Sequence, residues 1–322
     1  MPVTDEHTLL RRDPAEFARE LLASLSLPAE PLVAANGWSN AVWLAPEHVV
    51  RLSSGRFRDA YAHEVAVLHM LPDALPHAPS VAYGRVGNRE WMVLQRMPGR
   101  SLAQAWAGMT ERQRQDATTT IGRTLRIFHA TPLPERFHNP WLTDALSPDG
   151  TVADAYHAPP HHFQRLIRAA SFIPGIDAGL LHAVEAFIAA RLDAFAGDRA
   201  VLVHGDAHFA NWQWDGERVT ALLDYEGARP AAPDLELDTL LRFVGEPWQF
   251  APPDDSRVLT ARELATVPRW LADAYSDLFA HPRLAERLAV YDALWQLVQL
   301  HHFSPRSHVP DPRIRLHALI AE

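Results

Sequence analysis

VLVHGDAHFANWQW at residues 201–214 and VTALLDYEGA at residues 219–228 are the two segments that decide the fold. Each contains a short apolar run that predicts a buried strand, and each run ends on polar residues. Asp206 follows the first run, Asn211 comes five residues later, and Asp224 ends the second run. Three polar side chains therefore sit at strand ends, where a rigid scaffold can direct them to one point.

Such a set of side chains suits phosphoryl transfer. One carboxylate orients an attacking hydroxyl and takes its proton, while a carboxamide and a second carboxylate supply hard oxygen ligands to Mg²⁺. The alternative interpretation is a surface loop whose Asp and Asn side chains only cap turns.

The two segments resemble the aminoglycoside phosphotransferase and choline kinase-like family, relatives of the protein kinase fold. The family's catalytic loop reads His-Gly-Asp-x-x-x-x-Asn, and this chain has HGDAHFAN at 204–211. The family's metal-binding strand end is similar to LLDYEGA at 222–228, and its downstream Asp-Leu is similar to RPAAPDLELD at 229–238. The resemblance extends over roughly residues 30–305 because the order of strands and helices also fits.

The resemblance implies a role for each matched residue. Asp206 resembles the catalytic base that orients the substrate hydroxyl, and Asn211 and Asp224 resemble the Mg²⁺ ligands. His204 is expected to hold the loop through backbone hydrogen bonds, and Asp234 is expected to brace it.

In the N-terminal part, HVVRL at 48–52 places Arg51 where relatives carry Lys or Arg on the third strand. A cation there neutralises the α- and β-phosphates and is held by a helix carboxylate, for which Glu64 is the candidate. The chain contains no Lys, so all 30 of its Lys and Arg residues are Arg. The guanidinium of Arg is planar and makes paired contacts, whereas the ammonium of Lys is a point charge. Arg at this position is therefore not equivalent to Lys. The alternative is a strand-edge Arg with a solvated head.

Two further segments are similar to nucleotide-binding parts of the family. ANGWSNAVW at 35–43 has one Gly and no G-x-G-x-x-G motif, but Ser39, Asn40 and nearby backbone N–H groups are expected to contact phosphate. MVLQRMPG at 92–99 resembles the linker whose backbone binds adenine, which places Gln95 and Met97 beside the base. The alternative for 35–43 is an ordinary hairpin turn, and the alternative for 92–99 is that its apolar side chains are simply part of the core.

The hydrophobic periodicity and the turn-forming Pro and Gly residues predict an α+β chain in two lobes. The resemblance implies a bilobal protein kinase-like fold. A small β-rich N-lobe over 1–97 and a larger, mainly helical C-lobe over 98–322 meet at Pro98-Gly99. Strands are expected at 31–35, 41–45, 48–52, 80–86, 90–97, 201–204, 212–214 and 219–224, and helices at 13–25, 58–71, 110–130, 178–196, 234–244, 260–275 and 282–302.

Composition excludes several classes of protein. The chain has 322 residues, 48% of them hydrophobic, which excludes a disordered or fibrous chain. Without cysteines it has no disulfides or thiolate sites, and a formal charge of −9 argues against nucleic-acid binding. We expect a cytoplasmic protein that neither crosses nor binds a membrane, because no apolar run is long enough to span one and the first residues do not form a secretory signal. A monomer and a homodimer both remain open.

We therefore expect a kinase that uses Mg²⁺ and ATP or GTP to phosphorylate a hydroxyl of a small molecule, either an aminoglycoside-like antibiotic or a metabolite. The acceptor itself cannot be identified from the sequence. Candidate acceptor-binding residues are Glu226, Trp248 and Asp254.

Three other interpretations stay in view. His204, Asp206 and His208 can be the ligands of a metal-dependent hydrolase, although this leaves Asn211 and Asp224 without roles. A degenerate kinase fold can hold nucleotide without turnover, which the missing glycines and Lys favour and the complete acidic set opposes. A protein kinase is disfavoured, because Gly follows the loop histidine and no activation segment ending in Ala-Pro-Glu is present.

Overall fold

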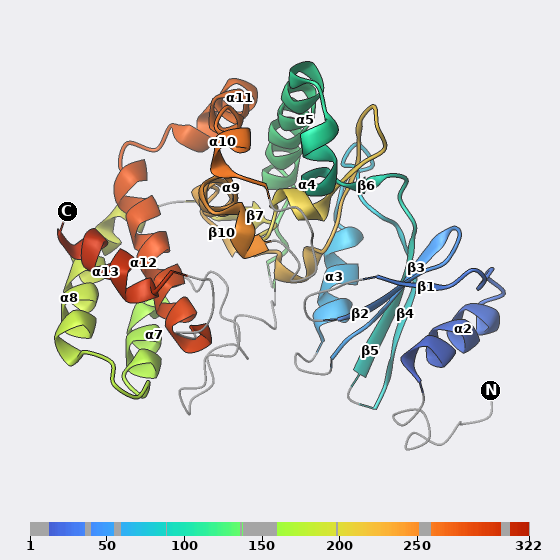
Figure 1. The fold of residues 1–322 in the computed structure, drawn as a ribbon, viewed down its shortest axis with the longest axis horizontal. Coiled ribbons are helices and arrows are strands. Elements are labelled where there is room, and N and C mark those ends of the chain that lie inside the picture. Colours follow the sequence, from blue (N-terminus) through green and yellow to red (C-terminus); the bar gives the residue numbers. More distant parts are fainter. Residues whose placement is uncertain are drawn as a thin grey trace.

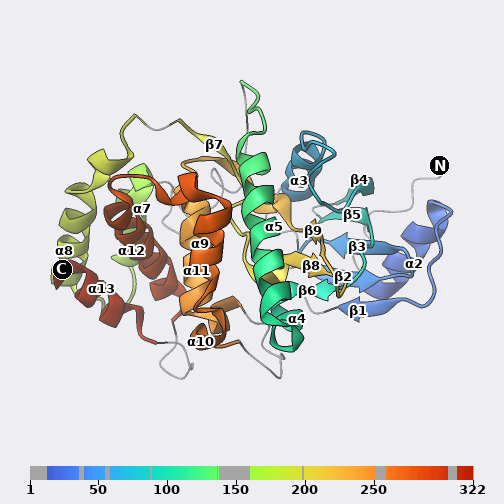
Figure 2. The same cartoon turned by 90° about the horizontal axis from the view of Figure 1, so that it is seen from above.

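A computed structural model describes residues 13–35, 40–54, 59–87, 89–135, 137, 160–197, 199–250, 259–303 and 310–321. The N-terminal part is built on a β-sheet, and the C-terminal part is mainly helical (Figure 1). This arrangement confirms the predicted fold class. Helix α5 (Glu111–His129) runs between the sheet and most of the C-terminal helices, as seen from above in Figure 2.

The N-terminal sheet is antiparallel and has five strands in the order β1-β2-β3-β5-β4. Its strands are β1 (Val33–Ala35), β2 (Ala41–Leu44), β3 (His48–Leu52), β4 (Ser80–Val86) and β5 (Arg89–Gln95). Helix α2 (Pro14–Ser24) packs Phe17, Leu21 and Leu22 against Trp43 and Val50 of the sheet. Helix α3 (Ala60–Leu68) lies between the sheet and the C-terminal part, where it contacts the segment that follows Asp224.

Two small sheets frame the predicted catalytic loop. β7 (Val201–Val203) pairs with β10 (Arg229–Ala231), and β8 (Trp212–Trp214) lies between β6 (Arg100–Ser101) and β9 (Val219–Leu222). β6 follows Gly99, whose φ is +105° and where an added Cβ would lie 2.1 Å from the Trp214 carbonyl oxygen. Glycine is therefore required where the chain leaves the first sheet and joins the second.

The C-terminal helices lie beside these sheets and extend to the far end of the molecule (Figure 1). They are α4 (Leu102–Ala105), α5, α7 (Phe163–Ala170), α8 (Ala178–Ala189), α9 (Asp234–Gly245), α10 (Ala261–Leu264), α11 (Val267–Ala274), α12 (Leu284–His302) and α13 (Pro312–Ala321). The single helix expected at 260–275 is divided into α10 and α11, because Pro268 at the start of α11 cannot continue the preceding turn. Sequence patterns did not predict β6, β10, α4, α7 or α13.

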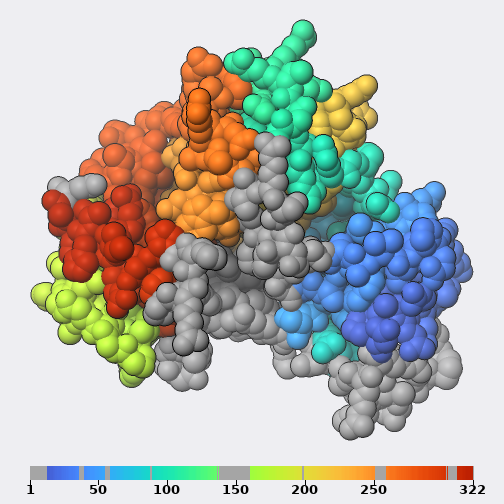
Figure 3. Space-filling view, viewed as in Figure 1, coloured from blue at the N-terminus to red at the C-terminus, as the bar shows by residue number. Residues whose placement is uncertain are grey.

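The largest core cluster connects α5 and α9 to the catalytic loop. Trp106, Phe209, Trp212 and Phe243 are buried in it, with Trp106 and Phe243 both close to the Phe209 ring. In the space-filling view the sheet and α12–α13 occupy opposite ends of the long axis (Figure 3). None of the helices in the described ranges combines the length and apolarity needed to cross a membrane.

Candidate active site

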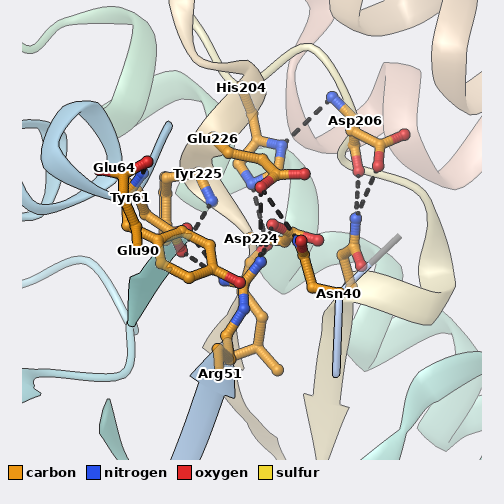
Figure 4. A network of polar contacts seen from close by, with 12 residues as sticks. Asn40, Arg51, Tyr61, Glu64, Glu90, His204, Asp206, Asp224, Tyr225 and Glu226 are labelled. Carbon is orange, nitrogen blue, oxygen red and sulfur yellow. Dashed lines mark hydrogen bonds and ion pairs between the residues drawn. The ribbon is translucent and has the colours of Figure 1, made fainter. Parts of the chain in front are cut away.

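The predicted catalytic loop and the end of β9 are joined by the backbone. The N–H of Leu223 donates to the Asn211 carbonyl at 2.9 Å, which places Asp224 beside the loop that carries Asp206. Figure 4 shows Arg51 of the N-terminal sheet between Glu64 of α3 and Asp224, with Asp206 on the neighbouring loop. This backbone hydrogen bond therefore fixes the distance between the loop that carries Asp206 and the end of β9, which carries Asp224.

His204 has the supporting position that the resemblance implies. Its Nδ1 accepts from the Asp206 N–H at 3.2 Å, so Nε2 carries the proton and donates to the Leu223 carbonyl at 3.0 Å. Burial lowers the pKa of this fully buried ring, which keeps it neutral. Both ring nitrogens are bonded to backbone groups, so His204 has no lone pair left for a metal.

A residue that sequence reasoning missed braces the loop. The Glu236 carboxylate accepts from the backbone N–H groups of His204 at 2.6 Å and Gly205 at 3.1 Å. Burial acts to raise the pKa of Glu236, but the imidazoles of His129 and His204 and the His204 N–H lower it overall. The carboxylate therefore holds the start of the loop as a charged acceptor.

Asp234, the residue expected to brace the loop, lies elsewhere. Its carboxylate binds the buried Arg287 of α12 through Nε at 2.6 Å and Nη2 at 2.7 Å. Residues two apart on a helix point about 200° away from each other, so Asp234 and Glu236 cannot both face the loop. Of these two acidic residues of α9, Asp234 therefore binds α12 and Glu236 binds the loop.

Asp206 and Asn211 are bonded to each other within the loop. The Asn211 Nδ2 donates to the Asp206 carbonyl at 2.8 Å and to its Oδ2 at 3.1 Å. Since the amide nitrogen is used in this way, the Asn211 Oδ1 is left as an acceptor on the other side. The Asp206 side chain is 43% exposed, so an incoming hydroxyl can reach it.

Arg51 of β3 reaches from the sheet to the C-terminal part. Its Nη1 lies 2.9 Å from both carboxylate oxygens of Glu64, and its Nη2 lies 2.8 Å from Asp224 Oδ1 and 3.6 Å from Glu226 Oε2. The Arg51 side chain is 9% exposed, so the solvated strand-edge alternative does not hold.

One guanidinium thus faces three carboxylates. Oxygen atoms of Glu64, Asp224 and Glu226 lie within 4.8 Å of one another. Burial raises the pKa of Glu64 to about 7, and burial with the neighbouring Asp224 charge raises the pKa of Glu226 well above its usual range. Asp224 adopts a left-handed backbone with φ 70°, a costly conformation that concentrates at functional sites. Three carboxyl groups share one guanidinium here, and a further cation bound among them would favour their ionised forms.

Helix α3 is fixed in place around Glu64. The Glu90 carboxylate of β5 accepts from the N–H groups of Tyr61 at 3.4 Å and Ala62 at 3.3 Å at the helix start. The Tyr225 N–H donates to Glu64 Oε1 at 3.3 Å, and His63 Nε2 lies 2.8 Å from the Ala228 carbonyl. The sequence contains no local signal for these partners, since each contact joins distant segments.

The remaining predicted residues are placed as follows. Asn40 Nδ2 contacts Glu226 Oε2 at 3.5 Å, so Glu226, a candidate for the acceptor, lies within the Arg51 cluster. Gln95 is exposed at the end of β5, and Met97 is half-buried against the main core. Trp248 is half-buried in the short helix Pro247–Phe250, while Ser39 and Asp254 fall outside the described residues.

Comparison with known proteins gives two results. The model of the phosphotransferase enzyme family matches residues 32–250. A search of curated proteins gives no match.

Solved structures with the same fold cover nearly the whole chain. The ADP-bound aminoglycoside phosphotransferase APH(2'')-Ib is 16% identical, with a TM-score of 0.63 over 96% of this chain and 97% of that one. Amicoumacin kinase hAmiN, in complex with AMP-PNP, Ca²⁺ and Ami, is 13% identical, with a TM-score of 0.62 over 99% and 95%. Aminoglycoside phosphotransferase APH(4)-Ia is 18% identical, with a TM-score of 0.61 over 96% and 99%.

Proposed function

The chain belongs to the phosphotransferase enzyme family, and from that premise we propose that it transfers the γ-phosphoryl group of ATP or GTP to a hydroxyl of a small molecule. The observation that carries the proposal is the convergence of Asp206, Asn211 and Asp224 at two joined strand ends, with Arg51 reaching them from the sheet. The nucleotide binds between the N-lobe, 1–97, and the C-lobe, 98–322.

The proposed reaction is an in-line displacement. The acceptor oxygen attacks the γ-phosphorus, the bond from that phosphorus to the β–γ bridging oxygen breaks, and the nucleoside diphosphate leaves. Asp206 orients the acceptor hydroxyl and takes its proton, since its carboxylate is exposed and held in place by Asn211. Arg51 neutralises the phosphates with a guanidinium already fixed by Glu64.

The residues present fit Mg²⁺. Asn211 Oδ1 is free to face a cation because its amide nitrogen bonds to Asp206, and Asp224 presents a carboxylate in a strained, left-handed position. Asn211 and Asp224 would hold the ion, whose charge would neutralise that of the phosphates.

The acceptor is proposed to be an aminoglycoside-like antibiotic or a metabolite. Aminoglycoside phosphotransferases and amicoumacin kinase have a similar fold, which supports a small-molecule acceptor with a free hydroxyl without identifying it. The hydrolase alternative has no support from the site, because His204 uses both ring nitrogens for the backbone.

Calorimetric titration with ATP and with GTP, each with and without Mg²⁺, tests the proposal on the wild type and on Asp224→Ala. We expect nucleotide binding that requires Mg²⁺ and is lost in the variant. Binding that ignores both Mg²⁺ and Asp224 would instead indicate a protein that holds nucleotide without turnover. Absence of any nucleotide binding would contradict the proposal.

A further inference from the structure

His208 has no role in the reaction described so far, although it lies two residues after Asp206 in the same loop. Its ring is buried, with Phe243 stacked at 6.0 Å and an interplanar angle of 15° on one side. Phe250 of the short helix Pro247–Phe250 contacts it at 4.7 Å between ring centroids. Aromatic neighbours thus restrict the orientation of this imidazole.

The backbone assigns the proton on this ring. Nδ1 accepts from the Ala210 N–H at 3.3 Å, which leaves Nε2 as the protonated nitrogen of the neutral ring. That Nε2 lies 3.3 Å from Asp206 Oδ1. The protonated nitrogen of His208 is therefore close enough to the carboxylate of the proposed base to donate to it.

The two oxygens of Asp206 then have different neighbours. Oδ1 faces the imidazole of His208, and Oδ2 accepts from Asn211 Nδ2 at 3.1 Å. An Asp carboxylate otherwise rotates in a broad, shallow well about its last torsion. A donor bonded to one oxygen and a second donor group within 3.3 Å of the other restrict the rotation of its plane.

We propose that His208 is a positioning residue, which fixes the Asp206 carboxylate in the orientation that receives the acceptor proton. The inference rests on the proposed function, since it gives His208 a task only if Asp206 is the base. Misplacing a catalytic group by about 1 Å can cost on the order of 100-fold in rate, so this support is expected to act on kcat.

Two substitutions separate this role from simple support of the loop. In His208→Gln, the side-chain Nε2 can still donate to Asp206, but the acceptor for the Ala210 N–H is displaced. In His208→Asn, the Oδ1 keeps the place of Nδ1 and caps Ala210, but the side chain is too short to reach Asp206. If His208 positions Asp206, His208→Gln should be the more active variant. If His208 only caps Ala210, His208→Asn should be the more active variant.

The probe is Mg²⁺-dependent hydrolysis of ATP, with water as the acceptor, measured beside Asp206→Asn and with a thermal melt of each variant. We expect kcat to fall about 10- to 100-fold in His208→Asn, with KM for ATP within about twofold, and to recover to within about fivefold of wild type in His208→Gln. Equal kcat in the two variants, or a better His208→Asn, would overturn the inference while leaving the proposed function intact. Hydrolysis that is unaffected by Asp206→Asn would overturn both.

A measurement on the folded wild type covers the case in which neither variant folds. Nitrogen-15 NMR of the His208 ring is expected to show that Nε2 and not Nδ1 carries the proton, and the ring signals are expected to shift in Asp206→Asn. A proton on Nδ1, or ring signals indifferent to Asp206→Asn, would overturn the inference.

Discussion

Arg51 and Asp224, 173 residues apart in the sequence, form an ion pair of 2.8 Å. The same guanidinium holds Glu64, so one side chain joins the sheet, helix α3 and the strand end that carries a proposed metal ligand. A lysine ammonium is a compact point charge without this planar fork. Arginine at this position therefore gives the chain a fixed bridge between its two parts.

Replacing Arg51 tests that bridge. Arg51→Met leaves Glu64 buried without its cation and removes the charge that faces the phosphates, so we expect at least a 100-fold loss of kcat/KM for nucleotide. Arg51→Lys keeps the positive charge but cannot contact Glu64 and Asp224 at the same time, so we expect kcat/KM for nucleotide to fall about 10-fold. Steady-state kinetics with calorimetric nucleotide affinity measure both. Equal activity in wild type and Arg51→Met would exclude the bridge from the reaction.

Asn211→Ala removes the proposed metal ligand together with the donor to Asp206. We expect kcat/KM to fall at least 100-fold, which is a loss of about 2.7 kcal/mol in transition-state stabilisation. We also expect the Mg²⁺ concentration that gives half-maximal turnover to rise. Asn211→Asp is the control, since it keeps an oxygen ligand but places a charge beside Asp206. A Mg²⁺ titration of turnover compares them, and an unchanged Mg²⁺ requirement in Asn211→Ala would remove Asn211 from the metal site.

The Glu236 carboxylate predicts a pH-dependent stability. Its pKa is lowered in the folded state from the ordinary value of 4.5, so its stabilisation is present above that pH and is lost as the pH falls through the lowered value. Glu236→Gln is expected to cost about 2–4 kcal/mol at pH 7, because the amide cannot accept from both loop N–H groups as well. The difference in Tm between the two proteins should narrow below pH 4.5, and a constant difference on acidification would refute this role.

Gly205 is predicted to tolerate no side chain. Its φ is +81°, and an added Cβ would lie 2.4 Å from Arg229 Nη1 and 3.0 Å from the Gly227 carbonyl oxygen. We expect Gly205→Ala to destabilise the fold by about 1–3 kcal/mol and to lower turnover by moving Asp206. Gly108→Ala is the control, since no atom lies within 4 Å of its added Cβ. Denaturant unfolding that gives equal stability for both variants would contradict the packing described for the loop.

The sequence was informative where chemistry and spacing are local. Asp206 and Asn211 lie in one loop of eight residues, HGDAHFAN, and the apolar run before Asp224 marks its strand. The structure also brings Arg51 and Glu64 together, as the thirteen-residue spacing suggested, because a strand and the next helix are adjacent in the fold.

Long-range partners were not predictable in this way. Glu236 binds backbone N–H groups 31 and 32 residues earlier, and Glu90 binds the start of α3 across a similar separation. Backbone N–H groups are the same at every residue, so nothing in the sequence indicates which carboxylate they face. The finding that Glu236 and not Asp234 braces the loop has the same origin, since it depends on the rotation of α9 about its axis.

Direct observation of phosphoryl transfer tests the central claim. The wild type and Asp206→Asn would be incubated with Mg²⁺, ATP or GTP, and a panel of aminoglycosides and other polyhydroxylated small molecules, and followed by phosphorus-31 NMR. The account predicts a new phosphomonoester signal that appears with one equivalent of nucleoside diphosphate in the wild type and at least 100-fold more slowly in Asp206→Asn. Phosphoester formation at the same rate in both proteins would contradict it.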